Sequence, residues 1–460
     1  MNSHTLENPF ARGFRTSSIV FVAILAASLS PFISPLVIVI PLAAAGFLWV
    51  LFRYPLTALG GFLAFMPVDY MAIELGKFAG LPHMSVVSAC TKEVPFLLLT
   101  LILWRRNGFT PAAPDWFLLA CSGLAAVYTA FGGSLTALVI DFNFIIPYFL
   151  GRMTVLSQKQ EQLWARWAVW IAASVAVLGL IEVWILGEGP RTILYLATDS
   201  ETEGGHLTGS FSGSGFSWMR EAATMVGPNG FGALCMIALI LWWVYFRNPL
   251  PGGMIAIGLV FSVTRSAWLG AAVAIPLLAF LMDQKKRLFL YAALGLALFV
   301  AAIPMLDLNE YLANTTKAGQ DSSVEGHQQD IVDGLHYAAE HPLGSGNQKA
   351  STVNRKGNAN SVSFETTYVS LAVEYGIPDA LCFVGFVFAA LYLVWRQQSP
   401  LAYAAVGILV GLSLVMVVTL PLVDRRLACW AMFPVGLAIR AAREDSPGAG
   451  FPPSTIPERS

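Results

Sequence analysis

The sequence PNGFGALCMIALILWWVYF, residues 228–246, contains no charged side chain. A helix needs roughly 20 apolar residues to cross the hydrocarbon core of a bilayer, and this stretch is close to that length. Similar apolar stretches lie near residues 17–34, 35–52, 55–72, 85–104, 114–131, 134–151, 164–186, 251–265, 266–282, 288–305, 366–395, 401–421 and 427–441. The pattern predicts an all-α integral membrane protein with about 12–14 transmembrane helices.

The composition also indicates a membrane protein. Of the 460 residues, 56% are hydrophobic and 12% are charged, whereas soluble globular proteins contain about 45–50% apolar and about 25% charged residues. The 27 Lys and Arg nearly balance the 28 Asp and Glu, which gives a formal net charge of -1. These values exclude a soluble enzyme, a disordered chain and a protein that binds nucleic acid through a basic surface.

Lys and Arg residues in short loops predict the orientation of the chain. They recur after every second apolar stretch, so all of them can be placed in the cytoplasm. These residues are Arg12, Arg15, Arg53, Arg105, Arg106, Arg152, Lys159, Arg166, Arg247, Lys285, Lys286, Arg287, Arg396, Arg440 and Arg443. Both termini are then cytoplasmic, and two long polar segments, about 187–227 and 306–365, lie on the opposite side. We expect one membrane domain over residues 1–441 and a Pro- and Ser-rich, disordered cytoplasmic tail over residues 442–460.

The second polar segment, 306–365, contains the pattern of a short helix. Residues 322–325, SSVE, match a capping box, which marks the start of a helix. Ile331 and Leu335 follow at helical spacing, and Pro342 ends the pattern. We expect this helix to lie along the membrane surface with its apolar side toward the lipid.

Ionisable residues near the ends of the apolar stretches are the first candidates for function, because a charge at bilayer depth costs about 2.5–3.5 kcal/mol on insertion scales. Arg220, Arg265 and Glu365 all fall at the non-cytoplasmic face in the predicted topology. Two structural alternatives remain: Arg265 at a water interface, and Glu365 as a carboxylate that the dipole of a helix N-terminus favours. Glu374 and Asp141 also interrupt apolar stretches, and the sequence assigns them no role.

Four short motifs follow one another in the second half of the chain. They are Arg220 with Gly227-Pro228-Asn229-Gly230; Thr264-Arg265-Ser266 with Leu269-Gly270; His341-Pro342-Leu343-Gly344-Ser345-Gly346; and Glu365-Thr366-Thr367-Tyr368 through Glu374-Tyr375-Gly376-Ile377-Pro378. In order and spacing they resemble the superfamily of O-antigen ligases and Wzy-type O-antigen or exopolysaccharide polymerases. The resemblance covers residues 215–395, and it rests on the order of the motifs because each motif alone is weak.

Several positions differ from the pattern of this superfamily. Glu365 stands where the family has a His, and Thr366 stands where it has the next Asn. An Arg that is often found at the start of the loop helix corresponds to His327, and the last Gly of the pattern corresponds to Asp379. A carboxylate in place of the His resembles the polymerase branches more than the ligases.

The resemblance implies glycosyl transfer from a polyprenyl-pyrophosphate donor. Arg220 and Arg265 would bind the pyrophosphate, because a guanidinium group bonds phosphate oxygens bidentately and stays charged. Glu365 would act as the general base for the acceptor hydroxyl, and a single carboxylate without a covalent intermediate would invert the anomeric configuration. We therefore expect a metal-independent enzyme without a cofactor and without a metal site.

Other residues are candidates for substrate contacts. His327 and His341 belong to the loop helix or its end, and solvated or capping roles are their alternatives. Tyr368 follows Glu365 in the fourth motif. Arg425 and Arg426 lie at a non-cytoplasmic turn, against the usual bias of positive charge. They either bind substrate phosphate or sugar, or indicate an error in the predicted spans at this end.

The sequence thus predicts a glycosyltransferase of the bacterial inner membrane that polymerises undecaprenyl-pyrophosphate-linked oligosaccharide repeat units at its periplasmic face. One alternative is an O-antigen ligase that transfers glycan to lipid A-core. Another is a transporter of polysaccharide lipids, which would explain the spans but not two long loops with arginines at their bases. The expected partners are the lipid-linked oligosaccharide, the polysaccharide chain, membrane lipids, a chain-length regulator and a flippase, but no nucleic acid.

Overall fold

The structure is a computed structural model of the chain. It describes residues 46, 49–68, 84–131, 133–186, 223, 225, 227–302, 322–347, 364 and 366–444. The predicted span at 17–34, most of the span at 35–52, most of the first polar segment and residues 445–460 lie outside the described residues. The chain divides into two compact units, Met1–Gly60 and Gly61–Ser460. In the first unit, residues 49–53 and 55–60 are helical.

The described part of the chain is all-helical and contains no strand. Its α-helices are α3 (Pro55–Phe65), α5 (Met84–Asn107), α6 (Ala113–Ala130), α7 (Leu135–Asp141), α8 (Ile145–Met153), α9 (Gln158–Ile181), α12 (Pro228–Tyr245), α13 (Pro249–Phe261), α14 (Arg265–Leu281), α15 (Lys285–Ala302), α17 (Ser322–Glu340), α19 (Thr367–Tyr375), α20 (Ile377–Trp395), α21 (Pro400–Val415) and α22 (Arg425–Glu444). Short 3₁₀ or π turns are η1 (Met66–Val68), η2 (Glu182–Leu186) and η5 (Pro421–Val423).

Within the described residues, three helices are long and apolar enough to cross a membrane: α9, α12 and α20. The bent pair of α7 and α8 makes a fourth if it counts as one span, and α3, α13, α14 and α21 are shorter apolar helices. The prediction of an all-α membrane protein is confirmed. The number of 12–14 spans stays a prediction, because several of them fall on residues that are not described.

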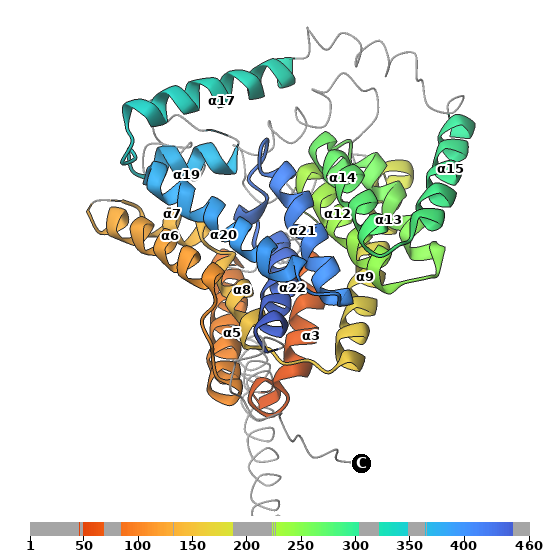
Figure 1. Cartoon of the computed structure of the whole chain (residues 1–460), viewed down its shortest axis with the longest axis horizontal. Coiled ribbons are helices and arrows are strands. Elements are labelled where there is room, and N and C mark those ends of the chain that lie inside the picture. Colours follow the sequence, from red (N-terminus) through yellow and green to blue (C-terminus); the bar gives the residue numbers. More distant parts are fainter. Residues whose placement is uncertain are drawn as a thin grey trace, which may run out of the picture. The chain divides into compact units, whose positions relative to one another are not determined.

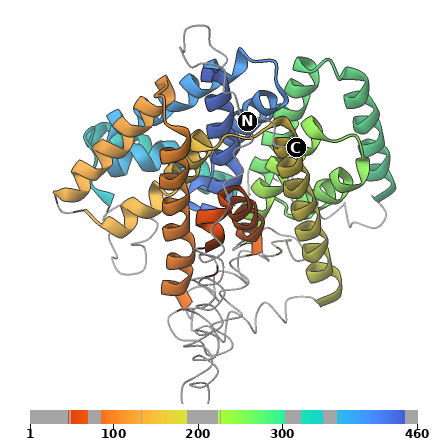
Figure 2. The same cartoon turned by 90° about the horizontal axis from the view of Figure 1, so that it is seen from below.

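In the second unit, α21 and α22 lie between two groups of helices (Figure 1). One group contains α5, α6, α7, α8, α19 and α20, and the other contains α9, α12, α13, α14 and α15. Helix α22 packs on α8 and α12, while α21 packs on α14, α12 and α20. The view from below places α9 beside α12–α15 and α6 at the opposite edge (Figure 2).

Helix α9 shows how this unit meets lipid. Its buried positions are mostly small residues, such as Ala172, Ala176 and Gly179. Its exposed positions include large apolar side chains such as Trp167 and Trp170. This distribution is the reverse of a soluble helix, because small residues allow close helix packing while the large apolar residues need an apolar solvent. The surface of α9 therefore suits a lipid bilayer.

Helices α8 and α22 cross closely at two glycines. A Cβ atom on Gly151 would overlap the carbonyl oxygen of Phe433, and a Cβ atom on Gly436 would overlap the carbonyl oxygen of Tyr148. Only glycine permits this approach, because the atoms in the way belong to the backbone and cannot rotate aside. These small residues therefore allow the backbones of α8 and α22 to pack closely and fix their relative position at this crossing.

We expect Gly436→Ala to destabilise the protein by about 1–3 kcal/mol or more, since the added methyl group must push two backbones apart. Thermal unfolding in detergent measures this change. Gly123→Ala in α6 is the matched control, because a Cβ atom there meets nothing within 4 Å, and alanine favours a helix. Equal melting temperatures of Gly436→Ala and wild type would contradict the described crossing.

Two predicted spans are not continuous helices. The stretch 134–151 divides into α7 and α8, which are bent by 52° relative to each other. The prediction of one span over 366–395 is wrong, because α19 ends at Tyr375 and α20 begins at Ile377. The intervening Gly376 has φ of +97°, a conformation that breaks the helix and that side chains disfavour.

Candidate functional site

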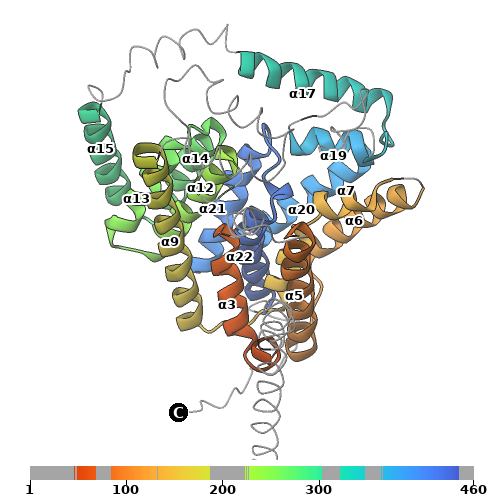
Figure 3. The same cartoon turned by 180° about the vertical axis from the view of Figure 1, so that it is seen from behind.

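The helix predicted in the second polar segment is present as α17, which runs from Ser322 to Glu340. It packs on α19 in the second unit, and both lie at the same end of the helices (Figure 3). The third motif, residues 341–346, follows α17 directly. The loop helix therefore brings the third motif next to the fourth, of which α19 forms the larger part.

Backbone hydrogen bonds fasten the third motif to the fourth. The Ser345 N–H donates to the Val373 carbonyl at 2.8 Å, and the Gly346 N–H donates to the Glu374 carbonyl at 3.1 Å. The Ile377 N–H donates to the Pro342 carbonyl at 2.9 Å. The last carbonyls of a helix have no partner within the helix, so the third motif serves as the cap of α19.

Two glycines make this contact possible. Gly344 and Gly376 have φ of +89° and +97°, and their backbones lie against each other. A Cβ atom on Gly376 would lie 2.7 Å from the Leu343 carbonyl carbon, which is closer than real Cβ atoms approach. The glycines in these two motifs are thus explained by a tight backbone contact and by positive φ.

We expect Gly376→Ala to detach the third motif from α19 and to lower the thermal stability of the protein. The substitution adds strain of about 1–3 kcal/mol for the unusual φ, and the contact with Leu343 adds a steric overlap. Gly346→Ala is the matched control, because Gly346 has φ of +90° but open space around its Cβ position. The melting temperatures of both variants, measured by differential scanning, separate the strain of the positive φ from the steric overlap with Leu343. A melting temperature of Gly346→Ala as low as that of Gly376→Ala would contradict the steric contact.

The N-terminal end of α19 docks on the segment that follows α21. Thr366 is the N-cap residue, and its side chain accepts a hydrogen bond from the Val369 N–H. The Thr367 N–H donates to the Met416 carbonyl at 3.0 Å, and the Thr367 hydroxyl donates to the Thr419 carbonyl at 2.9 Å. The same segment continues through η5 to Asp424 and the start of α22.

The first and second motifs meet this segment from the other group of helices. A Cβ atom on Gly230 would lie 3.6 Å from Oδ2 of Asp424, and the Thr264 hydroxyl donates to the Pro228 carbonyl at 2.9 Å. The described parts of the four motifs therefore lie close together: the fourth motif binds residues 416–419, the start of α12 lies near η5 and Asp424, and the second motif binds the first. We call these described parts, residues 227–230, 264–270, 341–346 and 366–378, the motif cluster.

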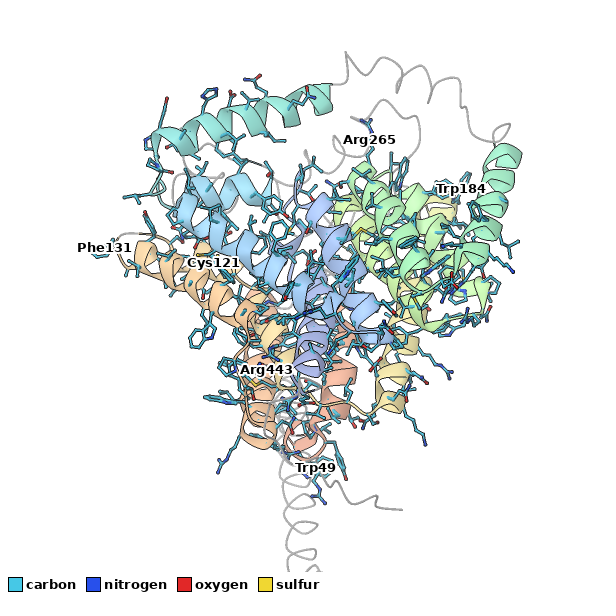
Figure 4. The ribbon with its side chains drawn as sticks, in the orientation of Figure 1. Trp49, Cys121, Phe131, Trp184, Arg265 and Arg443 are labelled. Atoms are coloured by element: carbon cyan, nitrogen blue, oxygen red, sulfur yellow. The ribbon has the colours of Figure 1, made fainter. Side chains whose placement is uncertain are left out.

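Arg265 is the first residue of α14 and is exposed. Its side chain extends outward from the end of α14, at the end of the unit where α17 lies, whereas Arg443 lies toward the opposite end (Figure 4). The N-terminal end of a helix carries partial positive charge, so a cation there is disfavoured for stability. The same arrangement attracts anions, because the guanidinium group and the N-terminal end of the helix both carry positive charge.

Arg425 and Arg426 begin α22 and are each 8% exposed. Arg426 Nη1 lies 3.4 Å from Asp424 Oδ2, and the Arg426 N–H donates to Asp424 Oδ1 at 2.9 Å. Because Asp424 lies next to the position of Gly230 and α12 packs on α22, the structure places both arginines near the first motif. The proposed binding of substrate phosphate or sugar by Arg425 and Arg426 stays a prediction.

The other predicted site residues have different surroundings. His341 is exposed and stacks on Tyr337 with ring centroids 4.4 Å apart. His327 lies within α17. The Tyr368 hydroxyl donates to the Ser413 carbonyl at 3.4 Å and so contacts the backbone of α21. Arg220 and Glu365 lie outside the described residues, so their predicted roles stay predictions.

Sequence reasoning missed two pairs of interacting polar residues. Arg152 was assigned to a cytoplasmic loop, but it is 2% exposed, and Nη2 binds Asp115 Oδ2 at 2.9 Å while Nε binds Asp115 Oδ1 at 3.0 Å. Asp141 and Glu374 meet between α7 and α19. No spacing signal could reveal either pair, because the partners are far apart in sequence. Among the described residues, no group of three or more His, Cys, Asp or Glu is placed to hold a metal ion.

The fold and the motif cluster define an all-α integral membrane protein with its signature residues gathered at one end of the helices. Residues 250–384 match the family model of the O-antigen ligase domain. This match supports the resemblance to the superfamily of O-antigen ligases and Wzy-type polymerases. The match includes Arg265, α17, α19 and the third and fourth motifs. No curated protein has a sequence that matches the chain.

Proposed function

We propose that the protein polymerises undecaprenyl-pyrophosphate-linked oligosaccharide repeat units at the periplasmic face of a bacterial inner membrane. The family supports an activity of the O-antigen ligase or polymerase type on lipid-linked glycans. The observation that carries the proposal is the joining of the four motifs at one end of the helices, with Arg265 exposed there. In the proposed topology, this end faces the periplasm.

In the proposed reaction, the growing chain leaves its own pyrophosphate carrier and is transferred to an incoming lipid-linked unit. Arg220 and Arg265 bind the pyrophosphate and neutralise the charge that develops as the glycosidic bond breaks. Glu365 takes the proton of the acceptor hydroxyl while the oxygen of this hydroxyl forms a bond to the anomeric carbon. The anomeric configuration therefore inverts. The arginines perform the electrostatic task that a metal ion performs in other transferases, so we propose a metal-independent reaction.

Glu365 distinguishes the polymerase from the ligase in this proposal. A carboxylate replaces the family's His at this position, which favours transfer between repeat units over transfer to lipid A-core. Arg425 and Arg426 are proposed as secondary contacts for substrate phosphate or sugar, since Asp424 places them beside the first motif. A chain-length regulator and a flippase are the proposed protein partners.

An activity assay of the purified protein, with lipid-linked repeat units as the only substrate, tests the proposal. A polymerase forms a ladder of products that differ by one unit, whereas a ligase forms product only when lipid A-core is added, and then by single transfer events. A transporter forms no new glycosidic bond under either condition. A ladder supports the proposed function, and its absence with active substrate contradicts it.

A further inference from the structure

Two carboxyl groups meet inside the second unit, and one of them, on Glu374, belongs to the motif cluster. Asp141 is the last residue of α7, and Glu374, on α19, is 2% exposed. Their side chains interact with each other and line the same small cavity. Ionised carboxylates only accept hydrogen bonds, so a bond between two carboxyl groups requires a proton on one of them.

The neighbouring donors occupy other oxygens of the pair. The Ser370 hydroxyl donates to Glu374 Oε1 at 2.6 Å, and the Tyr375 hydroxyl donates to Asp141 Oδ2 at 2.7 Å. Glu374 Oε2 is buried and accepts a hydrogen bond from no donor among the described residues. A proton held between the two carboxyl groups would satisfy this oxygen, which otherwise carries the full cost of burial.

Among the described residues, those that line the adjoining cavity supply no positive charge. A cavity with room for about one water molecule adjoins the pair, and no cationic side chain lines it. Its lining residues are Asp141, Phe144, Thr367, Ser370, Leu371, Glu374, Leu420, Leu422 and Val423. Two neighbouring carboxyl groups in a low-dielectric interior, with no cation lining their cavity, are not both ionised, so one proton stays with the pair.

The elements packed against α7 and α19 carry further titratable or charged groups. They include Tyr128 on α6, Tyr368 and Tyr375 on α19, Asp379 on α20, Glu340 and His341 at the end of α17, and Asp424, Arg425 and Arg426 after η5. Asp379 interacts with Glu374 as a second acid and therefore also favours the protonated pair. Asp424 is paired with Arg426.

We propose that Asp141 and Glu374 share one proton and that this pair positions the fourth motif for the reaction proposed above. Tyr375 connects the pair to Asn347, whose Nδ2 donates to the Tyr375 hydroxyl at 3.1 Å and to the Ser134 carbonyl at 2.9 Å. The protonated pair therefore ties α7, α19 and the end of the third motif together. Without the proton, two carboxylates repel each other and α19 separates from α7.

The pair predicts how activity depends on pH. The positioning is complete while the proton is held, and it is lost as the pH rises through the titration of the pair. Glu374→Gln imitates the protonated state, because its amide N–H can donate to the Asp141 carboxylate. We expect Glu374→Gln to keep polymer formation and to lose the decline at alkaline pH, whereas Glu374→Ala loses polymer formation. A Glu374→Gln variant as inactive as Glu374→Ala would overturn the proposal.

Infrared spectroscopy of the purified full-length protein tests the proton without measuring turnover. We expect the carbonyl stretch of a protonated carboxylic acid in wild type, a shift of this band in D₂O, and its loss in Glu374→Gln. Glu340→Gln, an exposed site at the end of α17, is the control and keeps the band. An identical band in wild type and Glu374→Gln would show that the pair holds no proton.

The two proposals fail separately in these measurements. If wild-type protein forms no glycan, the proposed function fails and with it the role of the pair in that reaction, whatever the infrared band shows. If wild-type protein forms polymer but the band does not depend on Glu374, only the proposal about the pair fails.

Discussion

Arg265→Ala is expected to lower the rate of polymer formation by about 10³-fold or more, the range that single arginines supply when they stabilise a phosphate-centred transition state. Arg265 begins α14 and is exposed, so its side chain is not part of the buried core. The loss should appear in kcat, because the charge on the departing pyrophosphate is largest in the transition state. Arg265→Lys keeps the charge but not the bidentate geometry, and we expect an intermediate rate.

The control for Arg265 is Arg443→Ala, which removes an exposed arginine toward the opposite end of the unit (Figure 4). Both variants should insert in the membrane and unfold at the wild-type temperature. Chain synthesis at the wild-type rate by Arg265→Ala would remove this residue from the proposed pyrophosphate site. Equal losses in both variants would indicate a general effect of charge and not a specific contact.

Glu365→Gln is expected to slow the reaction by about 10² to 10⁴-fold, the usual contribution of a general base. The amide keeps the shape of the side chain but cannot accept the proton of the acceptor hydroxyl. The structural alternative is a carboxylate that stabilises the start of α19. Thr366 already caps this helix, so that alternative predicts a loss of only about 0.3–1 kcal/mol in stability and little change in rate.

Measuring the unfolding temperature and the rate for Glu365→Gln separates these explanations. A general base predicts a large change in rate at nearly constant stability, and the control variant Glu340→Gln should change neither. If Glu365→Gln forms polymer normally, the fourth motif contains no base at this position and the proposed mechanism is wrong.

Much of the fold could be predicted from hydropathy. The stretch 228–246 corresponds to α12, Pro228–Tyr245, and the capping pattern at Ser322 together with Pro342 located α17. The break at Gly376 was missed because apolar residues continue on both sides of it. Hydropathy does not detect a positive φ, and the reason for that φ is the contact with Leu343, which lies in a different part of the sequence.

The site could be predicted only in part. The order of four motifs indicated the family, yet nothing in their spacing revealed that the third caps α19 or that residues 416–424 connect the fourth motif to the first. These contacts depend on helix packing over long separations in sequence. The pairing of Asp141 with Glu374 is of the same kind, since each residue alone resembles an isolated charge in an apolar stretch.

The most direct measurement reconstitutes the protein in vesicles with lipid-linked repeat units and follows the released carrier. We expect that one polyprenyl pyrophosphate is released for each new glycosidic bond, that EDTA does not change the rate, and that Arg265→Ala lowers the yield of both products together. Movement of repeat units across the bilayer without release of pyrophosphate would contradict the assignment of this protein as a glycosyltransferase.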